Sequence, residues 1–190
     1  MNIKRILFDN LERFGPLSDS QKNWLEIRMN VRMVPAKEII LHAGEFQNDF
    51  WFNVKGLFKY YYINSAGSEK IKYFCTENRF ILSISSFLEK TPSLFFVEAL
   101  EDSTLISIPA AEVLKELSNN GFWHSVFHAY LVESILEKEK READFLLKDS
   151  ETRYREFIHG NPVLAMRLRQ YEIAAYLGMD PAHLSRIRTK

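Results

Sequence analysis

The sequence is poor in the residues that cross-link a chain or carry it through a membrane. Its 190 residues include a single cysteine, Cys75, which excludes an intramolecular disulfide framework and any iron–sulfur cluster or zinc site that needs several thiolates. No apolar run approaches the roughly 18 residues that span a bilayer. Asp9, Glu12 and Arg13 interrupt the N-terminal segment, so we expect no secretory signal. These absences predict a cytoplasmic protein without a membrane partner.

An excess of positive charge, which nucleic-acid binding would favour, is also missing overall. The chain has 25 basic and 25 acidic residues, for a net charge of zero. The distribution is more informative than the sum, because basic residues outnumber acidic ones at the C-terminal end. Between positions 167 and 190 the basic residues are Arg167, Arg169, Arg186, Arg188 and Lys190, and the acidic ones are Glu172 and Asp180.

Aromatic residues are plentiful, and their pattern changes along the chain. Residues 3–14 and 18–30 are predicted to be short helices, with a capping box formed by Ser18 and Gln21. Residues 31–108 hold short β-branched and aromatic segments bounded by turn residues, which predict an all-β antiparallel roll or sandwich. After Pro109 the chain is predicted to be helical. The fold class is therefore α+β.

A long helix is predicted from residue 122 to residue 148. Its apolar residues recur at alternating spacings of three and four, with Glu139 as the polar exception, which is typical of a coiled-coil seam. The seam consists of Ala129, Val132, Leu136, Ala143 and Leu146, and its solvated flanks of Glu133, Glu137, Lys138, Lys140, Arg141 and Glu142. This pattern favours pairing with the same helix of a second copy. The alternative is a helix that only packs on the β domain.

Residues 170–189 carry the most informative motif, a helix-turn-helix. Ala174 is small where two crossing helices approach, and Gly178 suits the corner between them. Asp180 and Pro181 are suited to begin the second helix. Apolar residues fall where the two helices would share a core: Ile173, Leu177, Met179, Leu184 and Ile187. The alternative is an amphipathic hairpin within a larger helical bundle.

The second helix of this motif presents polar groups suited to the major groove of DNA. Arg186 is the main candidate, because arginine pairs with guanine O6 and N7 in bidentate fashion. The other candidates for DNA contact, whether to bases or to phosphates, are Pro181, Ala182, His183, Ser185, Arg188, Lys190, Arg167 and Arg169.

The order of β domain, long helix and C-terminal helix-turn-helix resembles the Crp/Fnr family of bacterial transcription regulators. Residues 41–45 (Leu-His-Ala-Gly-Glu) resemble the turn that opens the family's β-roll, and residues 55–57 (Lys-Gly-Leu) with 60–62 (Tyr-Tyr-Tyr) resemble its central hairpin. The resemblance implies effector sensing by residues 1–120, dimerisation by residues 121–148 and DNA binding by residues 149–190. It also implies RNA polymerase as a partner. Many relatives continue into a small β-wing, whereas this sequence stops at Lys190. Either the subgroup lacks the wing or the sequence is shortened, and a lower affinity is expected accordingly.

The effector region departs from the cyclic-nucleotide-binding members of that family. Those members carry Phe-Ile-Gly-Glu-Leu followed by Arg-Ser, where this chain has residues 80–84 (Phe-Ile-Leu-Ser-Ile) and Ser93-Leu94. Ser83 replaces the ribose-binding glutamate, and Ser93 replaces the phosphate-binding arginine. A buried phosphate without a cationic partner is costly, so we expect no response to cyclic AMP. The candidate lining is Leu82, Ser83, Ile84, Phe87, Ser93, Leu94 and Phe96. Either these side chains fill the pocket or an uncharged effector does.

Other functional classes find little support in the sequence. A metalloenzyme of the cupin type needs several histidines on its strands, and the β region has only His42. A hydrogen-bonding role is favoured for His42 over haem ligation, and interface packing is favoured over metal binding for His124 and His128. No nucleophile–base pair stands at a suggestive spacing. We therefore expect no catalytic activity, metal or cofactor. The alternative function is a ligand sensor that acts through protein contacts, with a vestigial helix-turn-helix.

Overall fold

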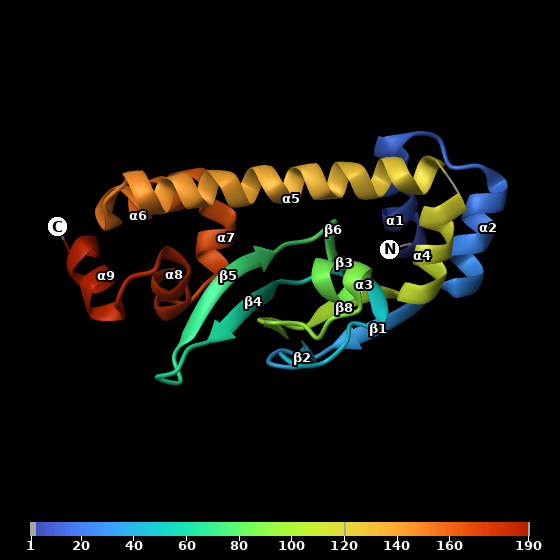
Figure 1. The fold of residues 1–190 in the computed structure, drawn as a ribbon. Helices are drawn as coiled ribbons and strands as arrows, with labels where there is room; N and C mark the ends of the chain where they lie inside the picture. The colour runs from blue at the N-terminus through green and yellow to red at the C-terminus, as the bar shows by residue number, and fades with distance from the viewer. Residues whose placement is uncertain (1–2, 120, 190) are drawn as a thin grey trace. The chain divides into compact units, whose positions relative to one another are not determined.

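The computed structural model describes residues 3–119 and 121–189 and contains two compact units. The first unit comprises Met1–Tyr60 and Phe74–Leu131, and the second Tyr61–Tyr73 and Val132–Lys190. Figure 1 labels the elements in chain order.

The first unit begins with short helices, as predicted. These are α1 (Ile3–Leu11), the 3-10 helix η1 (Glu12–Phe14) and α2 (Asp19–Arg28). The capping box at the start of α2 is confirmed: the Ser18 side chain accepts from the Gln21 backbone, and the Gln21 side chain accepts from the Ser18 backbone. Two otherwise unpaired backbone N–H groups are thereby satisfied.

Two four-stranded sheets follow, which confirms the predicted antiparallel roll. One sheet has the order β1-β8-β3-β6 and the other β2-β7-β4-β5. The first consists of β1 (Asn30–Val34), β8 (Ser103–Pro109), β3 (Asp49–Lys55) and β6 (Arg79–Ile81). The second consists of β2 (Ile39–Leu41), β7 (Phe96–Ala99), β4 (Phe58–Ile63) and β5 (Glu69–Cys75). The pairings of β1 and β3 with β8 are antiparallel.

The turn between β3 and β4 requires a glycine. Gly56 has a φ of +108°, and an added Cβ would lie 2.0 Å from Ser103 Oγ. Both the backbone conformation and the space therefore exclude other residues without a local rearrangement.

The prediction that residues 31–108 are entirely β is wrong at one place. Helix α3 (Ile84–Glu89) interrupts the strands, with Ser83 at its N-cap position. The reason is packing: Phe87 projects from α3 into the core and is fully buried. Its ring lies 5.7 Å from Phe50 and 5.7 Å from Phe127.

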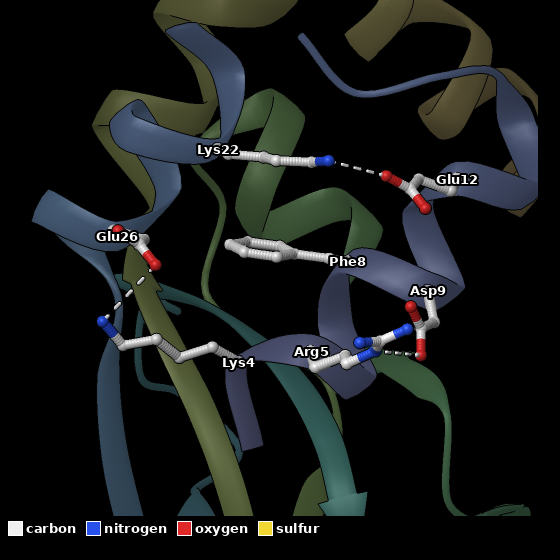
Figure 2. A pocket seen from close by; sticks show the side chains of 7 residues that line it. All are labelled: Lys4, Arg5, Phe8, Asp9, Glu12, Lys22 and Glu26. Atoms are coloured by element: carbon white, nitrogen blue, oxygen red, sulfur yellow. Dashed lines mark ion pairs between the residues drawn. The ribbon is translucent and has the colours of Figure 1, made fainter. Parts of the chain in front are cut away.

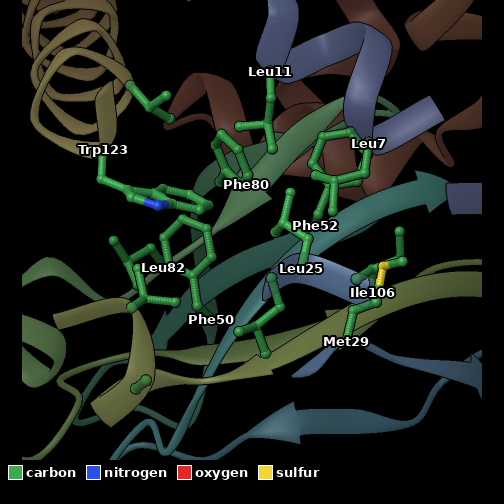
Figure 3. Close-up of a cluster of buried hydrophobic side chains, with 14 of the residues drawn as sticks. Leu7, Leu11, Leu25, Met29, Phe50, Phe52, Phe80, Leu82, Ile106 and Trp123 are labelled. Atoms are coloured by element: carbon green, nitrogen blue, oxygen red, sulfur yellow. The ribbon is translucent and has the colours of Figure 1, made fainter. Parts of the chain in front are cut away.

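The main core of this unit lies between the sheet β1-β8-β3-β6 and the helices (Figure 3). Phe80 is central to it, with ring-centroid distances of 4.8 Å to Phe50 and 5.3 Å to Phe52. Leu7 and Leu25 reach the same cluster from α1 and α2. Each such side chain contributes about 1.5–3 kcal/mol on burial.

The remaining elements are helical, as predicted. They are α4 (Ala110–Asn119), the long α5 (Gly121–Leu147), α6 (Ser150–Gly160), α7 (Pro162–Arg167), α8 (Gln170–Leu177) and α9 (Pro181–Arg188). Asp149 caps α6 by accepting from the Thr152 backbone, 2.8 Å away. No helix in the described part of the chain is long and apolar enough to cross a membrane.

Candidate nucleic-acid interface and effector region

Helices α8 and α9 form the predicted helix-turn-helix. Gly178 ends α8 in the left-handed conformation, with a φ of +68°. Asp180 caps α9 by accepting from the Ala182 backbone at 2.8 Å, and Pro181 takes the first helical position. The three turn signals in the sequence thus have the local roles that were predicted for them.

The two helices share an apolar core, in which Met179 and Ile187 of the predicted set are half-buried. Ile173, Ala174 and Leu177 of α8 are buried, as is Leu184 of α9. Glu172 is also buried, and its carboxylate accepts from the Arg169 backbone N–H at 2.7 Å. A carboxylate near the start of a helix is favoured by the helix dipole, so Glu172 stabilises the beginning of α8.

Most of the proposed DNA-contacting residues lie on the exposed side of the motif. The exposed ones are Pro181, Ala182, Ser185, Arg186 and Arg188 of α9, with Arg169 before α8. Arg167 is half-buried, and Lys190 lies outside the described residues. His183 is half-buried and turned toward α6, where its Nε2 lies 2.8 Å from Ser150 Oγ.

The candidate effector residues are not all brought together. Leu82 and Phe87 belong to the main core, whereas Leu94 is 74% exposed and Ile84 36% exposed. Phe96 is half-buried, with its ring 6.0 Å from that of His42. These residues therefore do not line one common cavity.

The two serines at the family's charged positions are buried. Ser93 donates through Oγ to the Phe95 carbonyl at 2.9 Å. The Ser83 backbone N–H donates to Gln47 Oε1 at 2.6 Å, while Ser83 Oγ has no hydrogen-bond partner among the described residues.

Gln47 is a key residue of this region that the sequence did not reveal. Its Nε2 donates to the carbonyls of Asp49 at 2.8 Å and Ile81 at 3.0 Å, and its backbone N–H donates to Ser86 Oγ at 2.8 Å. Gln47 therefore ties α3 to the end of β6. Because a buried glutamine has no sequence signature of its own, only the contacts identify it.

Tyr60 and Phe95 occupy space within the β domain beside these serines. The Tyr60 hydroxyl accepts from the Leu82 backbone N–H at 3.3 Å, and the two rings are 5.4 Å apart. Both side chains are buried. This packing favours the interpretation in which the protein's own side chains occupy the region.

His42 has a local structural partner. Its backbone N–H and its Nδ1 both lie 3.1 Å from Glu45 Oε2. The backbone hydrogen bond is the main reason that the pKa of Glu45 is lowered. Within the described residues, no three His, Cys, Asp or Glu side chains gather as a metal site.

One surface hollow lies between α1 and α2, and Figure 2 shows its lining. Its charges pair with one another: Lys22 with Glu12 at 3.0 Å, and Lys4 with Glu26 at 3.7 Å. Arg5 lies 3.6 Å from Asp9. Because the charges are compensated internally, the hollow offers no specific site for an ion.

Comparison with known proteins agrees with this architecture. Residues 31–120 match the family described as cyclic nucleotide-binding domain. No curated protein matches the chain significantly.

Among solved structures, a Crp/Fnr-family transcriptional regulator from Eubacterium rectale has a TM-score of 0.78 at 17% identity, covering 93% of this chain and 86% of that one. FixK2 from Bradyrhizobium japonicum has a TM-score of 0.75 at 17% identity, with coverages of 85% and 83%. CLP, the c-di-GMP responsive global regulator of Xanthomonas campestris, has a TM-score of 0.75 at 12% identity, with 88% of each chain covered.

The chain thus combines a cyclic nucleotide-binding domain fold with a helix-turn-helix. At these identities the structural likeness establishes the fold. It is the fold of the Crp/Fnr transcription regulators, and the predicted resemblance to them is confirmed.

Proposed function

We propose that the protein is a transcription regulator that reads an inverted-repeat DNA site as a homodimer. The observation that carries this proposal is the exposed face of α9, where Ser185, Arg186 and Arg188 are exposed while Leu184 of the same helix is buried in the core of the motif. In this proposal residues 1–120 form the sensor, 121–148 the dimerisation helix and 149–190 the DNA-binding domain.

Each exposed residue has a chemically defined role in such a complex. Arg186 pairs with a guanine, Ser185 contacts a neighbouring base, and the apolar Pro181 and Ala182 contact thymine methyl groups. Arg167, Arg169, Arg188 and Lys190 bind phosphates, which position the protein without specifying sequence. His183 supports the motif through Ser150 instead of reaching a base.

The long helix supplies the support for a dimer. Val132, Leu136 and Leu146 of the seam are 41%, 59% and 78% exposed, and Ala143 is exposed as well. A stripe of exposed apolar side chains at coiled-coil spacing is what a second copy of the same helix covers. Two recognition helices related by twofold symmetry enter successive major grooves about 34 Å apart.

In this proposal the protein does not respond to cyclic AMP through the segments that bind it in the cyclic-nucleotide-binding members of the family. The buried serines 83 and 93 carry no charge, and Ser93 Oγ is already bonded to a backbone carbonyl. A cyclic phosphate placed there would lose its hydration without gaining a cation, which is unfavourable by several kcal/mol or more. RNA polymerase is the protein partner that this function implies.

The test is selection of genomic DNA fragments by the purified protein. We expect enrichment of an inverted repeat, loss of that enrichment for Arg186→Ala, and no loss for Arg13→Ala, which removes an exposed arginine from the N-terminal helices. If nothing is enriched, the selection is repeated with cell extract. Rescue identifies an effector-dependent regulator, whereas continued failure contradicts the proposal in favour of a sensor that acts through protein contacts.

A further inference from the structure

A cluster of three side chains joins the long helix to the helix-turn-helix within the second unit. The Phe145 ring of α5 contacts two guanidinium groups, with Arg141 Cζ 5.0 Å and Arg153 Cζ 4.8 Å from its centroid. The Phe145 ring also packs against Gly178 at the turn of the helix-turn-helix. The contact is so close that a Cβ added to Gly178 would lie 2.5 Å from Phe145 Cε1. We call Arg141, Phe145 and Arg153 the clasp.

The two arginines bind the backbone at the C-terminal end of α8. Arg141 donates to the Tyr176 carbonyl at 2.8 Å, and Arg153 donates to the Leu177 carbonyl at 3.3 Å. The last four carbonyls of a helix have no partner within that helix, and the helix dipole makes this end favourable for cations. The two arginines therefore supply hydrogen-bond donors to the carbonyls of the last turn of α8, just before Gly178.

The same arginines hold two further segments. Arg153 also donates to the carbonyl of Lys148, the residue that follows α5, 2.6 Å away. Arg141 donates to the carbonyls of Ile71 at 2.9 Å and Lys72 at 2.8 Å, both on β5. One planar guanidinium reaches several carbonyls at once because its donors form a rigid fork, which a lysine lacks.

Arg141 and Arg153 are half-buried, whereas Phe145 is 38% exposed. Burial is the main reason that the pKa of Arg141 is lowered, with the nearby phenols of Tyr176 and Tyr62 opposing the shift. The guanidinium carbon of Arg141 lies 4.6 Å from the centroid of the Tyr176 ring, closer than to the Phe145 ring. Aromatic faces and carbonyl dipoles thus replace water around the cation.

The chain itself offers no equally direct connection between these elements. Two residues link α5 to α6, but α8 follows only after α6 and α7 have intervened. Because Arg141 and Phe145 lie on α5 and contact α8 or its corner, the clasp fixes the helix-turn-helix directly against the helix that carries the seam.

On the basis of the proposed function, we infer that Arg141, Phe145 and Arg153 are positioning residues that set the half-site spacing of the DNA target. Spacing depends on where each recognition helix is held with respect to the dimer axis. A loosened clasp lets the helix-turn-helix adopt several positions, so the protein loses discrimination between spacings while α9 still reads each half-site.

The experiment measures the affinity of the full-length protein for inverted repeats whose half-sites are moved apart or together one base pair at a time. The repeat is the one that the wild-type protein selects. The variants are Arg153→Lys, which keeps the charge but loses the fork, and Phe145→Leu, which keeps an apolar side chain. The matched control is Arg155→Lys, because exposed Arg155 lies on the same helix and pairs with Glu151. Thermal unfolding of each variant shows that it is folded.

We expect the wild type and Arg155→Lys to prefer one spacing, and both clasp variants to lose about tenfold in that preference, which corresponds to about 1.4 kcal/mol. Affinity for a single half-site should be unchanged. Folded clasp variants that keep the wild-type preference would overturn this inference and leave the proposed function intact. A wild type that binds no inverted repeat, either alone or with cell extract, would overturn both.

Discussion

The dimer interface proposed for α5 makes a quantitative prediction for Leu136→Ala. Complete burial of a leucine side chain contributes about 1.5–3 kcal/mol, and Leu136 is 59% exposed in the single chain. Covering that exposed part in a dimer contributes about 1–2 kcal/mol per copy. Because a twofold interface contains both copies, the substitution should weaken the dimer by about 2–4 kcal/mol, or roughly 30- to 700-fold in Kd.

Sedimentation velocity over a concentration series measures this Kd. The control is Glu142→Ala, since position 142 precedes Ala143 of the seam and lies about 100° round the helix from it. We expect Glu142→Ala to dimerise like the wild type. A Kd for Leu136→Ala within threefold of the wild-type value would refute the assignment of the seam as the interface.

Three further predictions concern separate parts of the chain. Arg188→Ala removes an exposed arginine from each copy, and therefore two phosphate contacts from the dimer. The slope of log DNA affinity against log salt concentration should become shallower by roughly 1.8. An unchanged slope in DNA-binding titrations would exclude a phosphate contact by Arg188. Gln47→Ala removes the side-chain hydrogen bonds of Gln47 to Ser83, Asp49 and Ile81, so it should lower the free energy of unfolding by about 2–4 kcal/mol. Ser83→Ala should be neutral or stabilising, because Ser83 Oγ has no hydrogen-bond partner among the described residues. Urea unfolding that gave the same loss of stability for both variants would contradict this prediction. Gly56→Ala should destabilise by about 2 kcal/mol or more, from the positive φ and the Ser103 clash, and an unchanged Tm would refute it.

The helix-turn-helix was predictable because its signals are local. Gly178, Asp180 and Pro181 act through the conformation of neighbouring backbone, and each residue type has a strong preference for that position. The extent of α5 was predictable for a similar reason, since the sequence predicted residues 122–148 and the helix spans Gly121–Leu147. Periodicity along one helix needs no knowledge of the rest of the fold.

The clasp and Gln47 were not predictable because they depend on segments far apart in sequence. The sequence placed Arg141 on a solvated flank of the long helix, and that prediction is wrong. Arg141 is half-buried, and its bonds reach carbonyls 69 and 70 residues away. Gln47 likewise bonds across 34 and 36 residues. Nothing in the pattern of either segment distinguishes such a side chain from a surface residue.

The seam residues and the two clasp residues of α5, Arg141 and Phe145, lie on different faces of the same helix. Val132 of the seam and Arg141 of the clasp are nine positions apart, which is about two and a half turns, so these two side chains point in opposite directions. A change in the seam should therefore alter the concentration at which the protein dimerises but not the preferred half-site spacing. A change in Phe145 should alter the preferred half-site spacing but not the concentration at which the protein dimerises. If one substitution altered both properties together, the helix would be acting as a single unit and the division into a seam and a clasp would be wrong.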